Sequence, residues 1–157
     1  MSRKMIGVVL SVFAFALAAA AQGQDPVMGT WKLNLAKSKY DPGPPQRSLT
    51  LRIEPSGPNG MKVTTDGVDG QGQPTHTEYT ANFDGKDYAI KGSTSYDTVT
   101  LKRIDPYTRV RIDKKGGNVV RMLRASVSKD GKTLTVASVG VNAQGQAAHD
   151  IAVYDKQ

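Results

Sequence analysis

Few residues in this chain have the types and spacing that catalysis requires. It contains no cysteine and only two histidines, His76 and His149, which lie far apart in the sequence. Glu78 follows His76 by two positions and Asp150 directly follows His149. Each pair has residue types that could act as an acid–base pair or as part of a metal site. Neither pair has the ligand spacing of a zinc site, and no G-x-S-x-G nucleophile motif occurs. The sequence therefore predicts no catalytic residue, no metal, no cofactor and no enzymatic activity.

One arginine lies where an interior contact is predicted. On a β-strand over residues 119–127, Arg121 shares a face with four apolar residues, namely Val119, Leu123, Ala125 and Val127. A guanidinium on such a face needs a partner. Two partners remain open: the ring of Trp31, by a cation–π contact of the kind that is common in folded proteins, or a carboxylate of a bound ligand, which the planar guanidinium fits.

The elements that position these residues are predicted to be β-strands nearly throughout. Valine, threonine and isoleucine dominate the apolar set, and these β-branched residues favour strands. Apolar and polar residues alternate with a period of two, as in antiparallel sheets with one polar face. Ten segments show this pattern: 29–35, 48–53, 61–65, 75–83, 88–90, 98–104, 108–113, 119–128, 133–141 and 149–155.

The alternation also assigns side chains to the two faces of each strand. In 75–83 it places Tyr79 inward, together with Ala81 and Phe83. In 108–113 it places Val110 and Ile112 inward and the neighbouring arginines outward, namely Arg109 and Arg111. Both assignments follow from the expectation that apolar residues face the core.

Glycine turns separate the strands. Asp84-Gly85, Gly116-Gly117 and Asp130-Gly131 supply the positive φ angles that tight hairpins need. A set of ten short antiparallel strands removes its free edges best by closing on itself. The fold class is therefore predicted to be all-β, an antiparallel up-and-down barrel of about 8–10 strands, with an additional N-terminal helix that belongs to a signal peptide.

Two segments of the sequence echo each other. Residues 67–76 (GVDGQGQPTH) and 140–149 (GVNAQGQAAH) are identical at six of ten positions. They indicate either a matched pair of binding loops at one rim or a hairpin repeated because its turn residues are favourable.

The two ends of the predicted domain resemble a known group of barrels. Gly29-Thr30-Trp31-Lys32-Leu33 and Val153-Tyr154-Asp155-Lys156 are similar to the first and last strands of the calycins, the lipocalins and intracellular fatty-acid-binding proteins. The stretches 29–40 and 129–157 are also similar to small exported bacterial proteins of the lipocalin-like type, most of them uncharacterised. The resemblance implies a small closed barrel and identifies no ligand. In lipocalins an arginine stacked on the tryptophan closes the barrel floor, and the resemblance implies this role for Arg121 on Trp31 as one of its two alternatives.

The chain departs from the fatty-acid-binding pattern in two places. Those proteins have a two-helix lid after the first strand, but residues 36–46 include three prolines and leave room for no more than one helical turn. They also hold the ligand carboxylate with an Arg-x-Tyr pair on the last strand, and the matching positions here are Ala152 and Tyr154. The resemblance thus implies Tyr154 as a ligand contact, with Arg121 as a substitute for the missing arginine.

The first 21 residues are predicted to be a cleavable signal peptide. Arg3 and Lys4 precede an apolar run that ends in Ala19-Ala20-Ala21, an A-x-A cleavage site. The apolar run is short for a membrane span, which needs about 20 residues. We therefore expect a signal peptide at 1–21, a short linker at 22–28 and one barrel domain at 29–157, and a periplasmic or secreted protein with no stable membrane span after cleavage.

The net charge of the chain and the distribution of its basic residues bear on its binding partners. The chain has a formal net charge of +7, and without residues 1–21 there remain 19 basic and 14 acidic residues, a net charge of +5. Six basic residues lie within 102–115, but Tyr107 is the only aromatic residue near them, so a nucleic-acid stacking surface is not indicated. A solvated outer face with weak attraction to anionic surfaces is predicted instead, on a monomer that binds no nucleic acid.

These observations leave two functions of different kinds. The first is an exported, non-enzymatic barrel that binds a small apolar or amphiphilic molecule in its interior, with Arg121, Tyr154, Tyr79 and Trp31 as the candidate ligand-binding residues. The alternative is an envelope-associated module that binds a protein or polysaccharide and has no ligand cavity.

Overall fold

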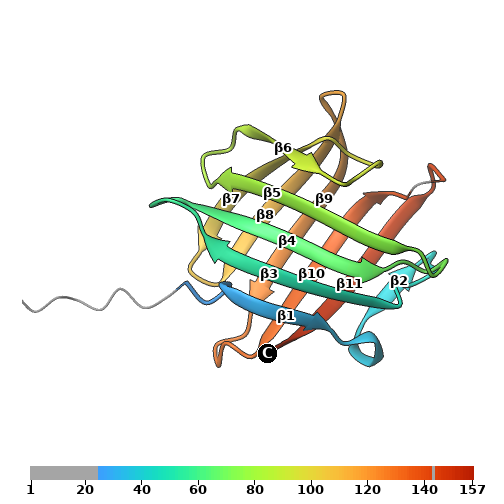
Figure 1. Ribbon diagram of the computed structural model, residues 1–157, viewed down its shortest axis with the longest axis horizontal. Coiled ribbons are helices and arrows are strands. Elements are labelled where there is room, and N and C mark those ends of the chain that lie inside the picture. Colours follow the sequence, from blue (N-terminus) through green and yellow to red (C-terminus); the bar gives the residue numbers. More distant parts are fainter. Residues whose placement is uncertain (1–24, 143) are drawn as a thin grey trace, which may run out of the picture.

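The computed structural model describes residues 25–142 and 144–157 and consists of one antiparallel sheet that closes into a barrel (Figure 1). The described residues contain eleven strands: β1 (Gly29–Leu33), β2 (Lys39–Asp41), β3 (Ser48–Pro55), β4 (Gly60–Val68), β5 (Pro74–Asn82), β6 (Asp87–Lys91), β7 (Thr98–Asp105), β8 (Thr108–Lys115), β9 (Asn118–Val127), β10 (Thr133–Val141) and β11 (Ala147–Lys156). From β3 to β11 each strand pairs with the next along the chain. The antiparallel up-and-down barrel is thus confirmed.

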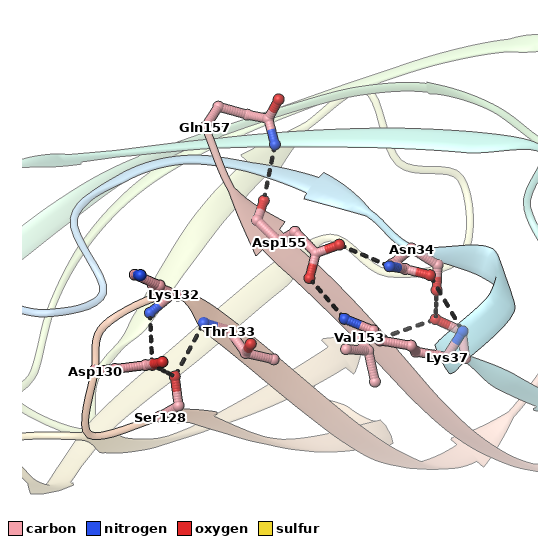
Figure 2. Close-up of polar contacts among 10 residues, drawn as sticks. Asn34, Lys37, Ser128, Asp130, Lys132, Thr133, Val153, Asp155 and Gln157 are labelled. Atoms are coloured by element: carbon pink, nitrogen blue, oxygen red, sulfur yellow. Dashed lines mark hydrogen bonds and ion pairs between the residues drawn. The ribbon is translucent and has the colours of Figure 1, made fainter.

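The barrel closes where β1 pairs with β11. Trp31 lies opposite Lys156 and Leu33 lies opposite Tyr154, while the other edge of β1 pairs with β3. Side chains reinforce this closure on the outside: Figure 2 shows Asn34 and Lys37 converging on Asp155, whose two carboxylate oxygens accept hydrogen bonds of 2.6 and 3.3 Å from them. The closing seam therefore ties the first strand to the last by both backbone and side chains.

All ten predicted strands are present, and ten strands form the closed ring. The eleventh, β2, was not predicted; it pairs with the part of β11 beyond the end of β1, from His149 to Ile151. A 3-10 turn at Leu35–Lys37 precedes β2, and Asn34 caps it by accepting a hydrogen bond from the backbone N–H of Lys37. Within the described part of the chain no helix has the length and apolar character to cross a membrane.

Successive connections alternate between the two ends of the barrel. One end, here termed the mouth, carries the connections β2–β3, β4–β5, β6–β7, β8–β9 and β10–β11. The opposite end, termed the closed end, is covered by residues 25–28. Trp31 is fully buried there and its indole Nε1 donates a 2.8 Å hydrogen bond to the carbonyl oxygen of Val27. Apolar residues from most strands fill the interior between the two ends, among them Ile53, Val63, Val99, Leu101, Val127 and Leu134.

Residues 25–28, which the sequence assigned to a linker, are part of the packed structure. Val27 and Met28 are buried, and the carboxylate of Asp25 accepts hydrogen bonds from Arg109 and Arg103. Short segments without alternation give no sequence signal for such packing, because the contacts that hold them come from distant strands. The predicted signal peptide at 1–21 lies outside the described residues.

Candidate functional site

The inward face of β8 carries charge, which corrects the assignment made from the sequence. Arg109 and Asp113 are buried, and Arg111 is mostly buried, whereas Val110 and Ile112 lie on the outer face. The prediction had the two faces reversed, because it assumed that the apolar side of a strand faces the core. In this barrel each inward-facing arginine has a carboxylate partner, so charged residues can occupy an inward face.

Three charged residues meet in the half of the interior nearer the mouth; we call Arg111, Asp113 and Arg121 the interior charge cluster. Asp113 is completely buried and accepts a 2.5 Å hydrogen bond from Nε of Arg111. Its second oxygen accepts a 2.7 Å bond from Nε of Arg121 and lies 2.6 Å from Nη2 of the same residue. Asp113 and Arg121 are cross-strand partners on β8 and β9, so the register of the two strands creates the contact.

Arg121 faces the interior, as its apolar companions on β9 indicated, but its partners differ from both alternatives drawn from the sequence. It pairs with Asp113 and lies 4.9 Å from the ring centroid of Tyr96. The cation over Trp31 is Lys156 instead, with Nζ 5.0 Å from the ring centroid. The sequence could not distinguish these cations, because Lys156 is brought to Trp31 only by the closure of the barrel.

Tyrosines surround the interior charge cluster. Arg111 lies 4.9 Å from the ring centroid of Tyr79 and 5.3 Å from that of Tyr96, so its guanidinium contacts both rings. Tyr154 is buried on β11 and Tyr40 is partly buried on β2. Of the four residues predicted to bind a ligand, Arg121, Tyr154 and Tyr79 therefore face the same half of the interior, while Trp31 lies at the closed end.

The pKa shifts in this region follow from burial and from the two guanidinium groups. Burial raises the pKa of Tyr79 and Tyr154, and burial together with Asp150 raises the pKa of Tyr40 to about 12. Burial opposes the ionisation of Tyr96 too, but the charges of Arg111 and Arg121 outweigh it and lower its pKa. Negative charge is thus favoured at Tyr96, which lies beside both arginines, whereas burial outweighs the arginines at Tyr79 and Tyr154.

The interior charge cluster has more positive than negative charge. Two guanidinium groups share the single carboxylate of Asp113, and the buried Nη2 of Arg111 has no hydrogen-bond partner among the described residues. Burial opposes the charge of Arg111, but Tyr79, Tyr96 and Asp113 together raise its pKa, so it remains protonated. A buried donor without a partner costs about 1–3 kcal/mol, and an anion that accepts from it would recover that free energy.

Two hollows open at the mouth. The larger, of about 340 Å³, is lined by Arg121 and by apolar residues of β9 and β10, which include Val119, Val139 and Val141. The smaller, of about 100 Å³, is lined by Tyr40, Asp150 and the loop around Pro42 and Pro44. The larger hollow is therefore mostly apolar, and its lining includes Arg121, one residue of the interior charge cluster.

The two echoing segments form equivalent hairpins at the mouth (Figure 1). In the β4–β5 hairpin the backbone N–H of Asp69 bonds to the carbonyl of Gln73, and in the β10–β11 hairpin Asn142 bonds to Gln146 in the same way, both at 2.9 Å. Gly72 and Gly145 occupy matching positions with φ of 88° and 76°, angles that favour glycine. The repeat is therefore a repeated turn, and it places two similar loops on one rim.

The histidines take no part in the interior. His76 is exposed, and its Nδ1 lies 2.7 Å from a carboxylate oxygen of Asp66 on the outside of the barrel. His149 is exposed on β11. Over residues 25–142 and 144–157, no three histidine or carboxylate side chains come together in a way that could hold a metal ion.

Arg111, Asp113 and Tyr96 are the site residues that sequence reasoning missed. A signal for the first two existed: an arginine and an aspartate two positions apart lie on one face of a strand, directly before the strand that carries Arg121. No comparable signal existed for Tyr96, because it lies in the β6–β7 loop and reaches the interior only through the fold.

Comparisons with known proteins agree with this architecture. No model of a known family matches the sequence, and no curated protein matches it. Among solved structures, the wild-type fluorescent protein UnaG is 14% identical, with a TM-score of 0.57 over 85% of this chain and 98% of UnaG. The zebrafish ileal bile acid-binding protein in complex with cholic acid is 14% identical, with a TM-score of 0.54 over 84% of this chain and 99% of that one.

At these identities the likeness shows the fold alone. Together with the closed ring of ten antiparallel strands, it places the chain in the class of small calycin-like barrels. The fold implied by the first and last strands in the sequence is thereby confirmed.

Proposed function

We propose that this protein is a non-enzymatic barrel that binds a small anionic amphiphile at its mouth, with the anionic group on Arg121 and Arg111. The observation that carries the proposal is the excess of positive charge beside an apolar hollow: two guanidinium groups share one carboxylate, and a buried donor of Arg111 has no partner in the described residues. Carboxylates bind guanidinium groups through strong, charge-assisted hydrogen bonds.

The surrounding residues suit the rest of such a ligand. Val119, Val139 and Val141 offer apolar contact beside Arg121. Tyr154 and Tyr79 remain protonated at neutral pH, since burial raises their pKa, and their hydroxyl groups can donate to an anion. The bile acid-binding protein with a similar fold was crystallised with cholic acid, which is an anionic amphiphile of this kind.

A paired titration tests the proposal. Dodecanoate and dodecanol share a chain length and differ in the charge of the head group. Arg121→Gln should weaken the binding of dodecanoate at least tenfold, because a hydrogen bond to a charged group contributes about 1.5–3 kcal/mol, and should leave dodecanol nearly unchanged. Lys129→Gln is the matched control, since Lys129 also stacks on a tyrosine, Tyr107, but lies toward the closed end. Equal binding of dodecanoate to Arg121→Gln and to the parent protein would refute the role of Arg121.

A second candidate function rests on the twin hairpins. The β4–β5 and β10–β11 loops present Gln71, Gln73, Gln144 and Gln146 on one rim, a polar surface suited to a protein or polysaccharide of the cell envelope. Exchanging both glutamines of each loop for alanine should then abolish partner binding and leave amphiphile binding intact, which separates this function from the first.

We further propose that the protein is exported and acts in the periplasm or outside the cell. The proposal rests on the basic residues Arg3 and Lys4, the apolar run and the A-x-A motif that ends at Ala21. The intact mass of the mature protein should correspond to residues 22–157. Recovery of only the full-length chain, embedded in a membrane, would contradict export.

A further inference from the structure

The outer face of β9, β10 and β11 carries an unusual concentration of exposed apolar residues. Seven large apolar side chains are exposed in residues 25–142 and 144–157, and five of them lie on these three strands. Val119 is at the mouth, and four others point outward with 44–50% of their surface exposed: Met122, Val139, Val141 and Ile151. We call these four residues the outer apolar patch.

Strand register makes the patch continuous. Met122 on β9 lies opposite Val139 on β10, and Ala137 on β10 lies opposite Ile151 on β11, which gives two adjacent rows across three strands. Val141 lies in the next row toward the mouth, opposite Ala147 on β11. Contiguous apolar surfaces of this kind on soluble proteins mark interaction sites, whereas single exposed apolar residues are ordinary. The patch therefore calls for a partner.

Basic residues flank the patch. The row of Ala137 and Ile151 continues to Arg124 on β9 at one end and to Lys39 on β2 at the other, and both side chains are exposed. The row of Met122 and Val139 ends at His149 and Asp41, which places a single acidic residue at one corner. The charge at the edge of the patch is thus positive on balance, in keeping with the net charge of the chain.

We propose that the outer apolar patch docks this protein on a membrane surface that contains anionic lipids. The four apolar side chains enter the boundary between head groups and acyl chains, as the apolar faces of peripheral proteins do, and Arg124 and Lys39 contact the anionic head groups. The proposal rests on this outer face and needs no ligand to be bound, although Met122, Val139 and Val141 also line the larger hollow at the mouth.

The register and the charges disfavour a second copy of the chain as the occupant. β9, β10 and β11 each have partners on both edges over the patch, so another strand cannot add to them. Two copies that faced each other through the patch would bring Arg124 and Lys39 of both molecules to one interface, with only Asp41 of each to offset them. An anionic bilayer neutralises these cations and covers the apolar residues at once.

The larger hollow at the mouth adjoins the patch. The β9–β10 ladder ends at the pair Arg121 and Gly140, and beyond this pair the hollow of about 340 Å³ lies between the two strands. Three residues of the patch, Met122, Val139 and Val141, line it, and Arg121 is also in its lining. A protein docked through the patch would therefore hold this opening against the lipid surface.

Vesicle flotation tests the proposal with the mature protein. Vesicles of phosphatidylcholine with about one third phosphatidylglycerol should carry the protein, and vesicles of phosphatidylcholine alone should not. The partition coefficient of Met122→Gln/Ile151→Thr should fall about fivefold for each replaced side chain, since each is half exposed. The coefficient of Arg124→Gln/Lys39→Gln should fall about fivefold for each lost charge. Binding should also weaken as salt rises, because exposed charges are screened.

Matched controls carry the same kinds of change elsewhere on the barrel. Ile104→Thr removes an exposed apolar residue on β7, away from the patch, and Lys86→Gln/Lys91→Gln removes two exposed charges from around β6. Both controls should bind vesicles as the parent protein does. The proposal is overturned if the parent protein does not float, if it binds neutral vesicles equally well, if the controls lose as much as the patch variants, or if light scattering shows a dimer that the patch variants abolish.

Discussion

The interior charge cluster predicts that Asp113→Asn destabilises the protein far more than an exposed carboxylate would. Asparagine keeps the shape of the side chain and removes the charge that neutralises Arg111 and Arg121. Breaking a buried ion pair from one side costs about 3–5 kcal/mol, because the remaining charge has no compensation. Arg111 is 17% exposed and Arg121 33% exposed, so solvent reduces this cost to about 2–3 kcal/mol.

Thermal unfolding followed by circular dichroism measures the effect. For a domain of this size each kcal/mol corresponds to about 3–6 °C, so the midpoint should fall by about 10 °C. Asp155→Asn is the matched control. Asp155 also accepts hydrogen bonds from two side chains, Asn34 and Lys37, but it is 43% exposed, so loss of its charge should lower the midpoint only slightly.

Anions should partly restore Asp113→Asn. With the carboxylate gone, two guanidinium groups remain uncompensated, and a small oxyanion that reaches the mouth takes its place. Sulfate should therefore raise the midpoint of Asp113→Asn more than that of Asp155→Asn at the same concentration, which separates binding from the general stabilisation that sulfate gives. The reasoning is refuted if Asp113→Asn loses less than about 1 kcal/mol, or if sulfate stabilises both variants equally.

Three further predictions follow from other contacts. Asp25→Asn leaves the buried Arg109 without its carboxylate and should lower the free energy of unfolding in urea by about 2–4 kcal/mol. Arg103→Gln removes the more exposed partner of Asp25 and should cost little. Equal losses in the two variants would contradict the view that Arg109 is the important partner of Asp25. Tyr40, Tyr79 and Tyr154 have raised pKa values, so they stay protonated in the folded protein at a pH where the tyrosines of the unfolded chain ionise. The free energy of unfolding should therefore fall as pH rises from about 10 to about 12, and it should fall less steeply in Tyr154→Phe. Urea midpoints at each pH measure this. Lys156→Met should change the emission of Trp31, whose ring centroid lies 5.0 Å from Nζ, while Arg121→Met should not; the opposite result would mean that Arg121 is the cation at the indole.

The sequence predicted the architecture better than the interior. The ten strands could be predicted from alternation and glycine turns, since those patterns are local and each hairpin has its own signal in the sequence. The inward position of Arg121 was also predictable, because four apolar residues share its face on β9. The same rule failed on β8, where Arg109, Arg111 and Asp113 face inward.

The failure on β8 has a physical cause. A charged residue can face a core when another strand supplies the opposite charge, and alternation within one strand carries no information about its neighbours. Arg121 meets Asp113 only through the register of β8 and β9, and Arg109 meets Asp25 only because residues 25–28 cover the closed end. Pairings between distant elements therefore decide which face of β8 is buried.

The closing seam has a consequence for how fast the barrel forms. Its side-chain contact between Asn34 and Asp155 joins residues 121 positions apart, and β1 has no partner on that edge until β11 is in place. Folding rates fall as contacts become more distant in the sequence, because the chain loses conformational entropy on closing the loop before the contact contributes any favourable energy. The hairpins from β3 to β10 can form while the chain is still incomplete, but the ring cannot. In a chain exported as proposed above, this delay keeps the barrel open until β11 has been synthesised, and an open chain is the form that can be threaded across a membrane.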